Sequence, residues 1–155
     1  MPVSVISSLS LFARERALHT LLNARGEGQR PAQVLTLDVL DQTREGEFPF
    51  KLTRTTATTT SVSTLPVEAE CVSCATGALV DEALESFDDD SELIIALPTA
   101  ISVAGTLQFA ENRACTVRNV VTALDITTFE DDLWARRVLA DSGVTPRPHR
   151  RANPR

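Results

Sequence analysis

Two cysteines separated by two residues are the strongest chemical signal in the chain. Cys71 and Cys74 lie in the segment Glu70-Cys71-Val72-Ser73-Cys74. Thiolates at this spacing can share one tetrahedral metal ion such as zinc, with Zn–S bonds of about 2.3 Å. A structural zinc site needs four ligands, and the pair supplies two. We predict a metal site in which Cys115 is the third ligand and His19, Glu68, Glu70 or a partner chain completes the set.

Two other interpretations of the cysteine pair stay open. Cysteines also serve as small apolar residues in a protein core, which would make the pair purely structural. A redox-active C-x-x-C pair is the less favoured interpretation, because the sequence pattern does not clearly show the two cysteines opening a helix after a strand.

The remaining reactive side chains give weaker signals. His19 lies beside the apolar face of a predicted helix and is more typical of a packing residue. A Ser–His–Asp triad or a Cys–His pair would need His19, and nothing in the pattern places it beside a nucleophile. Asp125 lies at the carboxyl end of a predicted strand, where α/β sheets bind ligands, but it is more typical of a helix cap.

Apolar patterns along the chain alternate between strand and helix spacing. The expected strands are 2–7, 34–40, 50–60, 92–97 and 118–125, and the expected helices are 12–25, 77–87, 100–111 and 127–141. This alternation predicts an α/β fold with three layers, in which right-handed crossovers build a mostly parallel sheet with helices on both faces.

The length and composition of the chain limit the kinds of protein that it can be. The chain has 155 residues, enough for one domain, which we assign to residues 1–143, and we expect a basic disordered tail at 144–155. The net charge of −6 disfavours general nucleic-acid binding, so we expect no DNA contact. The longest uncharged run, from Leu93 to Ala110, contains Pro98 and fits a buried strand and helix better than a membrane span. We expect reduced thiols and a cytoplasmic location, and we expect that the chain has no signal peptide.

The cysteine segment, with the strand before it and the helix after it, resembles the motif region of the CobW family of P-loop GTPases and metallochaperones. Most members carry C-x-C-C; here Cys71 and Cys74 match the outer cysteines and Ser73 stands at the middle one. The C-V-S-C form is similar to an actinobacterial branch with a degenerate P-loop, which includes a mycobacterial recruiter of a ribosome hibernation factor. Residues 92–98 and 120–125 resemble later strands of the family.

This resemblance covers roughly residues 3–140 and implies a P-loop-NTPase-like (Rossmann-like) half domain. It also exposes a departure from the family. A Walker A loop needs glycines to let backbone N–H groups surround phosphates, and a lysine for the β and γ oxygens. The matching stretch, residues 7–15, contains no glycine, and Arg14 falls at the lysine position. Glu15 falls at the position of the Mg²⁺-binding hydroxyl, where a carboxylate would repel the triphosphate.

Other nucleotide-binding features are missing as well. Ala96 stands where the family has a glutamate, and Lys51 is the only lysine, so the chain has no Asn-Lys-x-Asp motif. We therefore expect that the protein neither binds nor hydrolyses GTP.

The resemblance implies a non-hydrolysing accessory or adaptor protein that responds to zinc and acts in zinc homeostasis or ribosome hibernation. Its partner would be a protein such as a ribosome-associated factor, and the chain could form a homo-oligomer. The alternatives are a metallochaperone GTPase with a divergent P-loop and a structural remnant that acts through oligomerisation.

Overall fold

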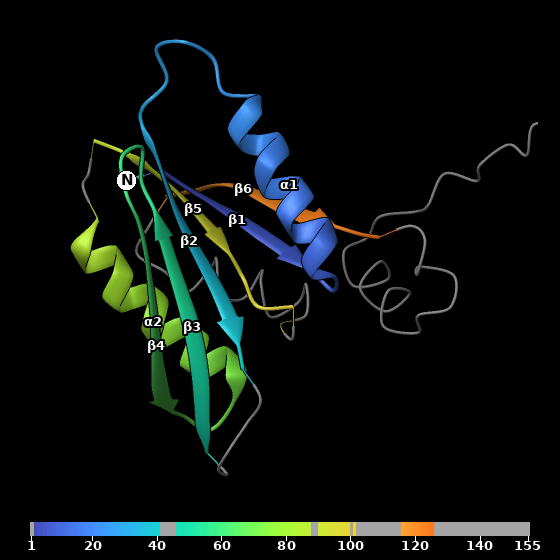
Figure 1. The fold of residues 1–155 in the computed structure, drawn as a ribbon, viewed down its shortest axis with the longest axis vertical. Coiled ribbons are helices and arrows are strands. Elements are labelled where there is room, and N and C mark those ends of the chain that lie inside the picture. The colour runs from blue at the N-terminus through green and yellow to red at the C-terminus, as the bar shows by residue number, and fades with distance from the viewer. Residues whose placement is uncertain (1, 41–45, 88–89, 100, 102–115, 126–155) are drawn as a thin grey trace, which may run out of the picture.

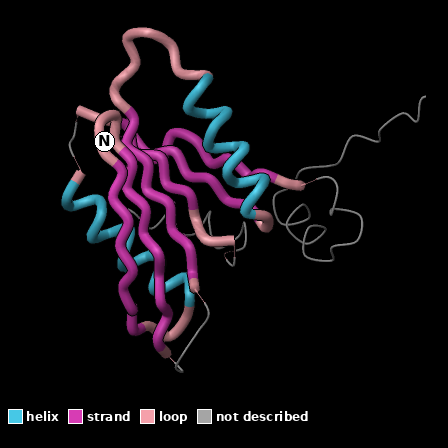
Figure 2. The backbone as a smooth tube through the Cα atoms, in the orientation of Figure 1, coloured by secondary structure: helices cyan, strands magenta, loops and turns pink. Residues whose placement is uncertain are grey.

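The computed structural model describes residues 2–40, 46–87, 90–99, 101 and 116–125. Six strands and two helices follow one another in this part of the chain (Figures 1 and 2). In chain order they are β1 (Pro2–Ser8), α1 (Leu11–Asn23), β2 (Ala32–Val39), β3 (Glu47–Thr55), β4 (Thr60–Glu68), α2 (Val72–Ser86), β5 (Glu92–Ala96) and β6 (Thr116–Ala123).

All six strands form one sheet in the order β4-β3-β2-β5-β1-β6. β5 pairs in parallel with β1 and β2, and β6 pairs in parallel with β1. β3 is antiparallel to β2, and β4 is antiparallel to β3. The structure confirms the predicted α/β class and the mostly parallel sheet, to which β3 and β4 add an antiparallel hairpin.

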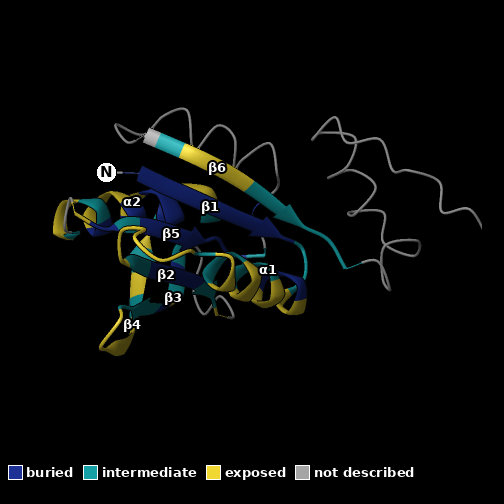
Figure 3. Cartoon of the chain, turned by 90° about the horizontal axis from the view of Figure 1, so that it is seen from above, coloured by how far each residue is buried: buried dark blue, intermediate teal, exposed yellow. Residues whose placement is uncertain are grey.

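The sheet separates two apolar layers because alternate residues of a strand point to opposite faces. On one face, Val5, Leu35 and Ile95 belong to the larger core, which α2 covers. On the other face, Ile6 and Ile94 pack with the apolar side of α1. Every residue of β1, which lies between β5 and β6, is buried, as the continuous dark blue in Figure 3 shows. The predicted three layers are therefore present.

The predicted single strand at 50–60 is in fact parts of two strands. β3 ends at Thr55 and β4 begins at Thr60, and between them the backbone N–H of Thr56 donates to the carbonyl of Thr59 at 2.8 Å. Threonine favours strands throughout this run, and no glycine or proline marks the turn. The pattern of residue types therefore concealed the hairpin.

The predicted helix at 77–87 begins five residues earlier, at Val72. Cys71 is its N-cap, a role that sequence patterns assign more readily to serine, threonine, asparagine or aspartate. Apart from Ile101, the predicted helices at 100–111 and 127–141 and the tail at 144–155 lie outside the described residues. In the part that is described, no helix has the length and apolar character needed to cross a membrane.

Candidate functional site

The connection between β1 and α1 is only two residues long, Leu9 and Ser10. Helix α1 begins at Leu11, so the three residues directly before Arg14 are already helical. In a Walker A motif the residues ahead of the lysine form an open loop around the phosphates. The chain has no such loop at this point.

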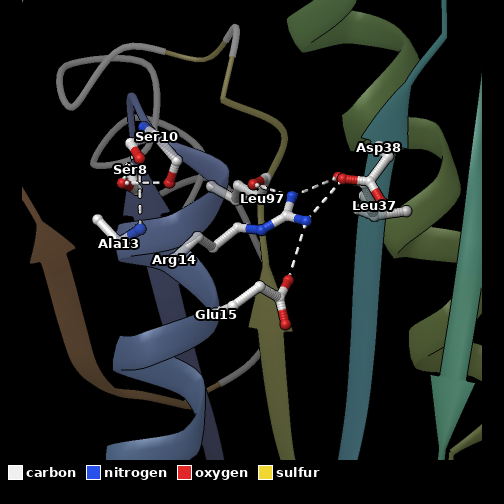
Figure 4. A network of polar contacts seen from close by, with 8 residues as sticks. All are labelled: Ser8, Ser10, Ala13, Arg14, Glu15, Leu37, Asp38 and Leu97. Atoms are coloured by element: carbon white, nitrogen blue, oxygen red, sulfur yellow. Dashed lines mark hydrogen bonds and ion pairs between the residues drawn. The ribbon is translucent and has the colours of Figure 1, made fainter. Parts of the chain in front are cut away.

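Local hydrogen bonds close this short connection. The backbone N–H of Ser10 donates to Oγ of Ser8 at 3.1 Å, and Ser8 Oγ donates to the carbonyl of Ser10 at 2.9 Å. Ser10 is the N-cap of α1, and its Oγ accepts the backbone N–H of Ala13 at 3.3 Å (Figure 4). The backbone N–H of Arg14 donates to the carbonyl of Ser10 at 3.0 Å. The backbone N–H groups of Ser10, Ala13 and Arg14 thus have partners within the protein.

Arg14 is almost completely buried, with 2% of its surface exposed. Its Nη1 donates to two main-chain carbonyls, those of Leu37 and Leu97, both at 3.1 Å. Leu37 lies near the carboxyl end of β2, and Leu97 directly follows β5. The guanidinium therefore spans the carboxyl ends of two neighbouring strands, which is where α/β sheets bind their ligands.

Two carboxylates neutralise this buried cation. Nη2 of Arg14 lies 2.6 Å from Oδ1 of Asp38 and 3.2 Å from Oε1 of Glu15 (Figure 4). Asp38 is about one-quarter exposed, whereas Glu15 is mostly exposed. One positive and two negative charges leave the cluster with a formal excess of negative charge. A triphosphate brought to this position would meet a cation that is already neutralised and a carboxylate that repels it.

Large apolar side chains surround the same edge of the sheet. Leu11 is 56% exposed, Phe12 is 64% exposed, and Leu40, which follows β2, is 41% exposed. We call these three residues the carboxyl-edge patch. Leu11 and Leu40 line one hollow together with Asp38. Phe12 lines a second hollow, and its ring lies 5.7 Å from the guanidinium carbon of Arg16.

The cysteine pair lies at the start of α2, after β4. Cys71 has an extended backbone as the N-cap, and its Sγ accepts the backbone N–H of Cys74 at 3.3 Å. The two Sγ atoms are 3.0 Å apart, and both cysteines are free and exposed. The interpretation as buried apolar residues is therefore wrong. The reason for disfavouring a redox pair is also wrong, because the two cysteines do open a helix after a strand.

The two thiols differ electrostatically. Hydrogen bonds from the thiol and the backbone N–H of Cys74 lower the pKa of Cys71. The pKa of Cys74 is raised, first by the hydrogen bond of its thiol to Cys71 and then by the charge on that sulfur. The nearby carboxylate of Glu70 acts to raise the pKa of both thiols.

The other predicted metal ligands do not join the pair within the described structure. The described residues contain no group of three or more histidine, cysteine, aspartate or glutamate side chains that could hold a metal ion. Cys115 lies outside the described residues. His19 is on α1, across the sheet from α2, and its Nδ1 lies 2.9 Å from the amide nitrogen of Asn23. Two thiolates on one tetrahedral zinc would lie about 3.8 Å apart, so the sulfurs would have to separate to bind one.

A second polar network occupies the amino edge of the sheet and was not predicted. Nη1 of Arg25 pairs with Oε2 of Glu92 at 2.7 Å, and Ser4 Oγ donates to Oε1 of Glu92 at 3.1 Å. Burial acts to raise the pKa of Glu92, but the hydrogen bonds from Arg25 and Ser4 and the charge of Arg25 outweigh it, so the pKa is lowered. Nothing in the sequence signals this contact, because the partners are far apart along the chain.

Comparison of the chain with protein-family models, curated proteins and solved structures finds no match. The resemblance to the CobW family therefore stays a prediction from the sequence motifs.

Proposed function

We propose that the protein is a non-hydrolysing α/β adaptor that works through protein contacts. The observation that supports this proposal is the position of Arg14. Its guanidinium occupies the edge of the sheet where a P-loop lysine would meet phosphates, and its partners there are Leu37, Leu97 and Asp38. A guanidinium held in this way supports the fold rather than a ligand.

The carboxyl-edge patch supports binding of a protein partner. Clustered exposed apolar side chains with polar neighbours are typical of protein interfaces. Leu11 and Phe12 begin α1, and Leu40 directly follows β2, so the patch lies at the edge of the sheet where P-loop proteins bind a nucleotide. In this proposal, the partner inserts apolar side chains beside Leu11 and Phe12.

The CobW-like motif gives the proposed setting. The adaptor would act in the cytoplasm, in zinc homeostasis or in ribosome hibernation, with zinc at Cys71 and Cys74 and a third thiolate from Cys115. Exposure of both thiols supports this, because a metal shared with another segment or a partner must be reachable from solvent. Zinc would fix the start of α2 and so change the surface that the partner meets.

Calorimetric titration of the full chain with Mg²⁺-GTP and Mg²⁺-ATP tests the first half of the proposal. We expect no saturable heat from either nucleotide. Saturable binding, or hydrolysis above the buffer rate, would contradict the adaptor function and favour the divergent GTPase.

Co-sedimentation with ribosomes, with and without zinc, tests the second half. The double variant Leu11→Ser/Phe12→Ser should no longer co-sediment with ribosomes. Val62→Ser removes a side chain of similar exposure (59%) on β4 and should still co-sediment. Equal association of both variants would exclude the carboxyl-edge patch as the docking surface.

A second candidate function, assembly with a further copy of the chain, is favoured by β4. This strand lies at the edge of the sheet, and none of the residues from Thr60 to Val67 is charged. Uncharged edge strands can pair with another strand. If the chain oligomerises in this way, Val62→Lys should convert it to a monomer in light scattering coupled to gel filtration, whereas Leu11→Ser should not.

A further inference from the structure

The contact between the two sulfurs has a consequence beyond adaptor function. Cys71 and Cys74 lie on the first turn of α2 with their Sγ atoms 3.0 Å apart, and solvent reaches both residues. A disulfide bond is about 2.05 Å long, so the sulfurs need to approach by about 1 Å. Both residues belong to one short segment, so this approach closes a very small loop.

We propose that Cys71 and Cys74 form a redox-active dithiol that becomes an intramolecular disulfide by exchange with a glutathione-type disulfide. This activity does not depend on the adaptor proposal. Its geometric basis is the strand-to-helix placement of the pair, with the first cysteine as the helix cap and the second facing it.

The geometry assigns different roles in disulfide exchange to the two thiols. Sγ of Cys71 accepts the backbone N–H of Cys74, so an anionic sulfur at Cys71 keeps a hydrogen-bond donor and lies at the positive end of the helix dipole. Cys71 is therefore the attacking thiol. Cys74 is the resolving thiol, because its sulfur is already beside that of Cys71.

Exchange proceeds in two steps. Cys71 gives its proton to solvent, and its sulfur attacks one sulfur of the small disulfide; the S–S bond breaks, and one glutathione thiolate leaves and takes up a proton. Cys74 then loses its proton and attacks Sγ of Cys71, which expels the second glutathione. In total, two protein thiols are oxidised to one disulfide, and one small disulfide is reduced to two thiols.

Mass spectrometry of the full chain tests the proposal. The reduced, chelator-treated protein is incubated with oxidised glutathione, quenched in acid and alkylated. We expect the wild-type chain to lose the mass of two hydrogens and to be alkylated only at Cys115, with peptide mapping that links Cys71 to Cys74. Cys115→Ser should form the same disulfide. Cys74→Ser should stop at a glutathione adduct on Cys71.

Serine at position 71 keeps a side-chain acceptor for the helix cap, so Cys71→Ser is expected to fold and to form no disulfide. Circular dichroism checks that α2 is retained in each variant. Three alkylated cysteines in the treated wild-type chain, a persistent glutathione adduct, or a disulfide that includes Cys115 would each overturn the proposal. Loss of ribosome association without change in disulfide formation would bear on the adaptor function alone.

Discussion

Arg14 and Asp38 meet at 2.6 Å, and this contact joins the first turn of α1 to the end of β2. The arginine is buried, and its Nη1 donates to two carbonyls at the ends of neighbouring strands. A lysine at this position in a P-loop would reach out to phosphate. Here the cation instead connects the helix to the sheet through hydrogen bonds at the edge where P-loop proteins bind nucleotide.

The first prediction concerns what this connection contributes to stability. Asp38→Asn should lower the free energy of unfolding by about 2 kcal/mol, because it leaves a buried guanidinium without its closest countercharge. Glu15→Gln removes the more exposed partner of the same cation and should cost about 0.5 kcal/mol or less. Urea unfolding followed by circular dichroism measures both. Equal effects from the two variants would show that the Asp38 contact has no special role.

The second prediction separates the effect of the residue type at position 14 from the effect of the short loop before it. Arg14→Lys restores the residue type of a P-loop, but the two-residue connection of Leu9 and Ser10 stays. We expect no gain in Mg²⁺-GTP binding by calorimetry. We also expect a loss of about 1–3 kcal/mol in stability, because one ammonium group cannot replace the fork that reaches two carbonyls and a carboxylate. Saturable GTP binding by this variant would mean that the arginine alone blocks the site.

The third prediction concerns pH. The pKa of Glu92 is lowered in the folded chain, so the unfolded chain binds the proton more tightly. The stabilising contribution of Glu92 is then complete above its unfolded pKa of about 4.3 and is lost as the pH falls below that value. Glu92→Gln should therefore be less stable than wild type by about 1 kcal/mol at neutral pH, and the difference should shrink in acid. A difference that is constant from neutral pH to pH ~3 would contradict the ion pair with Arg25.

Sequence patterns predicted the fold better than the site. The period-2 alternation at 34–40 predicted β2, and the continuous apolar run at 92–97 predicted β5, because both patterns are typical of strands. The threonine-rich run hid the β3–β4 hairpin, since threonine, which favours strands, continues through the turn.

At the site, the sequence marked Arg14 and Glu15 as departures from a P-loop. It could not show that Arg14 is buried against Asp38, because that depends on which strand lies next to β5. The cysteine pair was found by its spacing, but its position at the start of α2, with the two sulfurs in contact, was missed. A cysteine that caps a helix gives no distinctive pattern, so the start of α2 was placed too late.

The last prediction concerns zinc at the cysteine pair. Elemental analysis of the full chain, purified without chelator, should find zinc bound to the wild type and none bound to Cys71→Ser/Cys74→Ser. Within the described structure the pair has no third ligand, so an intermediate zinc content in Cys115→Ser would identify Cys115 as that ligand. Removal of zinc with a chelator should then expose both thiols to oxidised glutathione, and zinc added first should slow disulfide formation, because thiolates bound to a metal are poorer nucleophiles. Equal zinc content in the wild type and the double variant would exclude a metal at this pair and leave thiol–disulfide exchange as its chemistry.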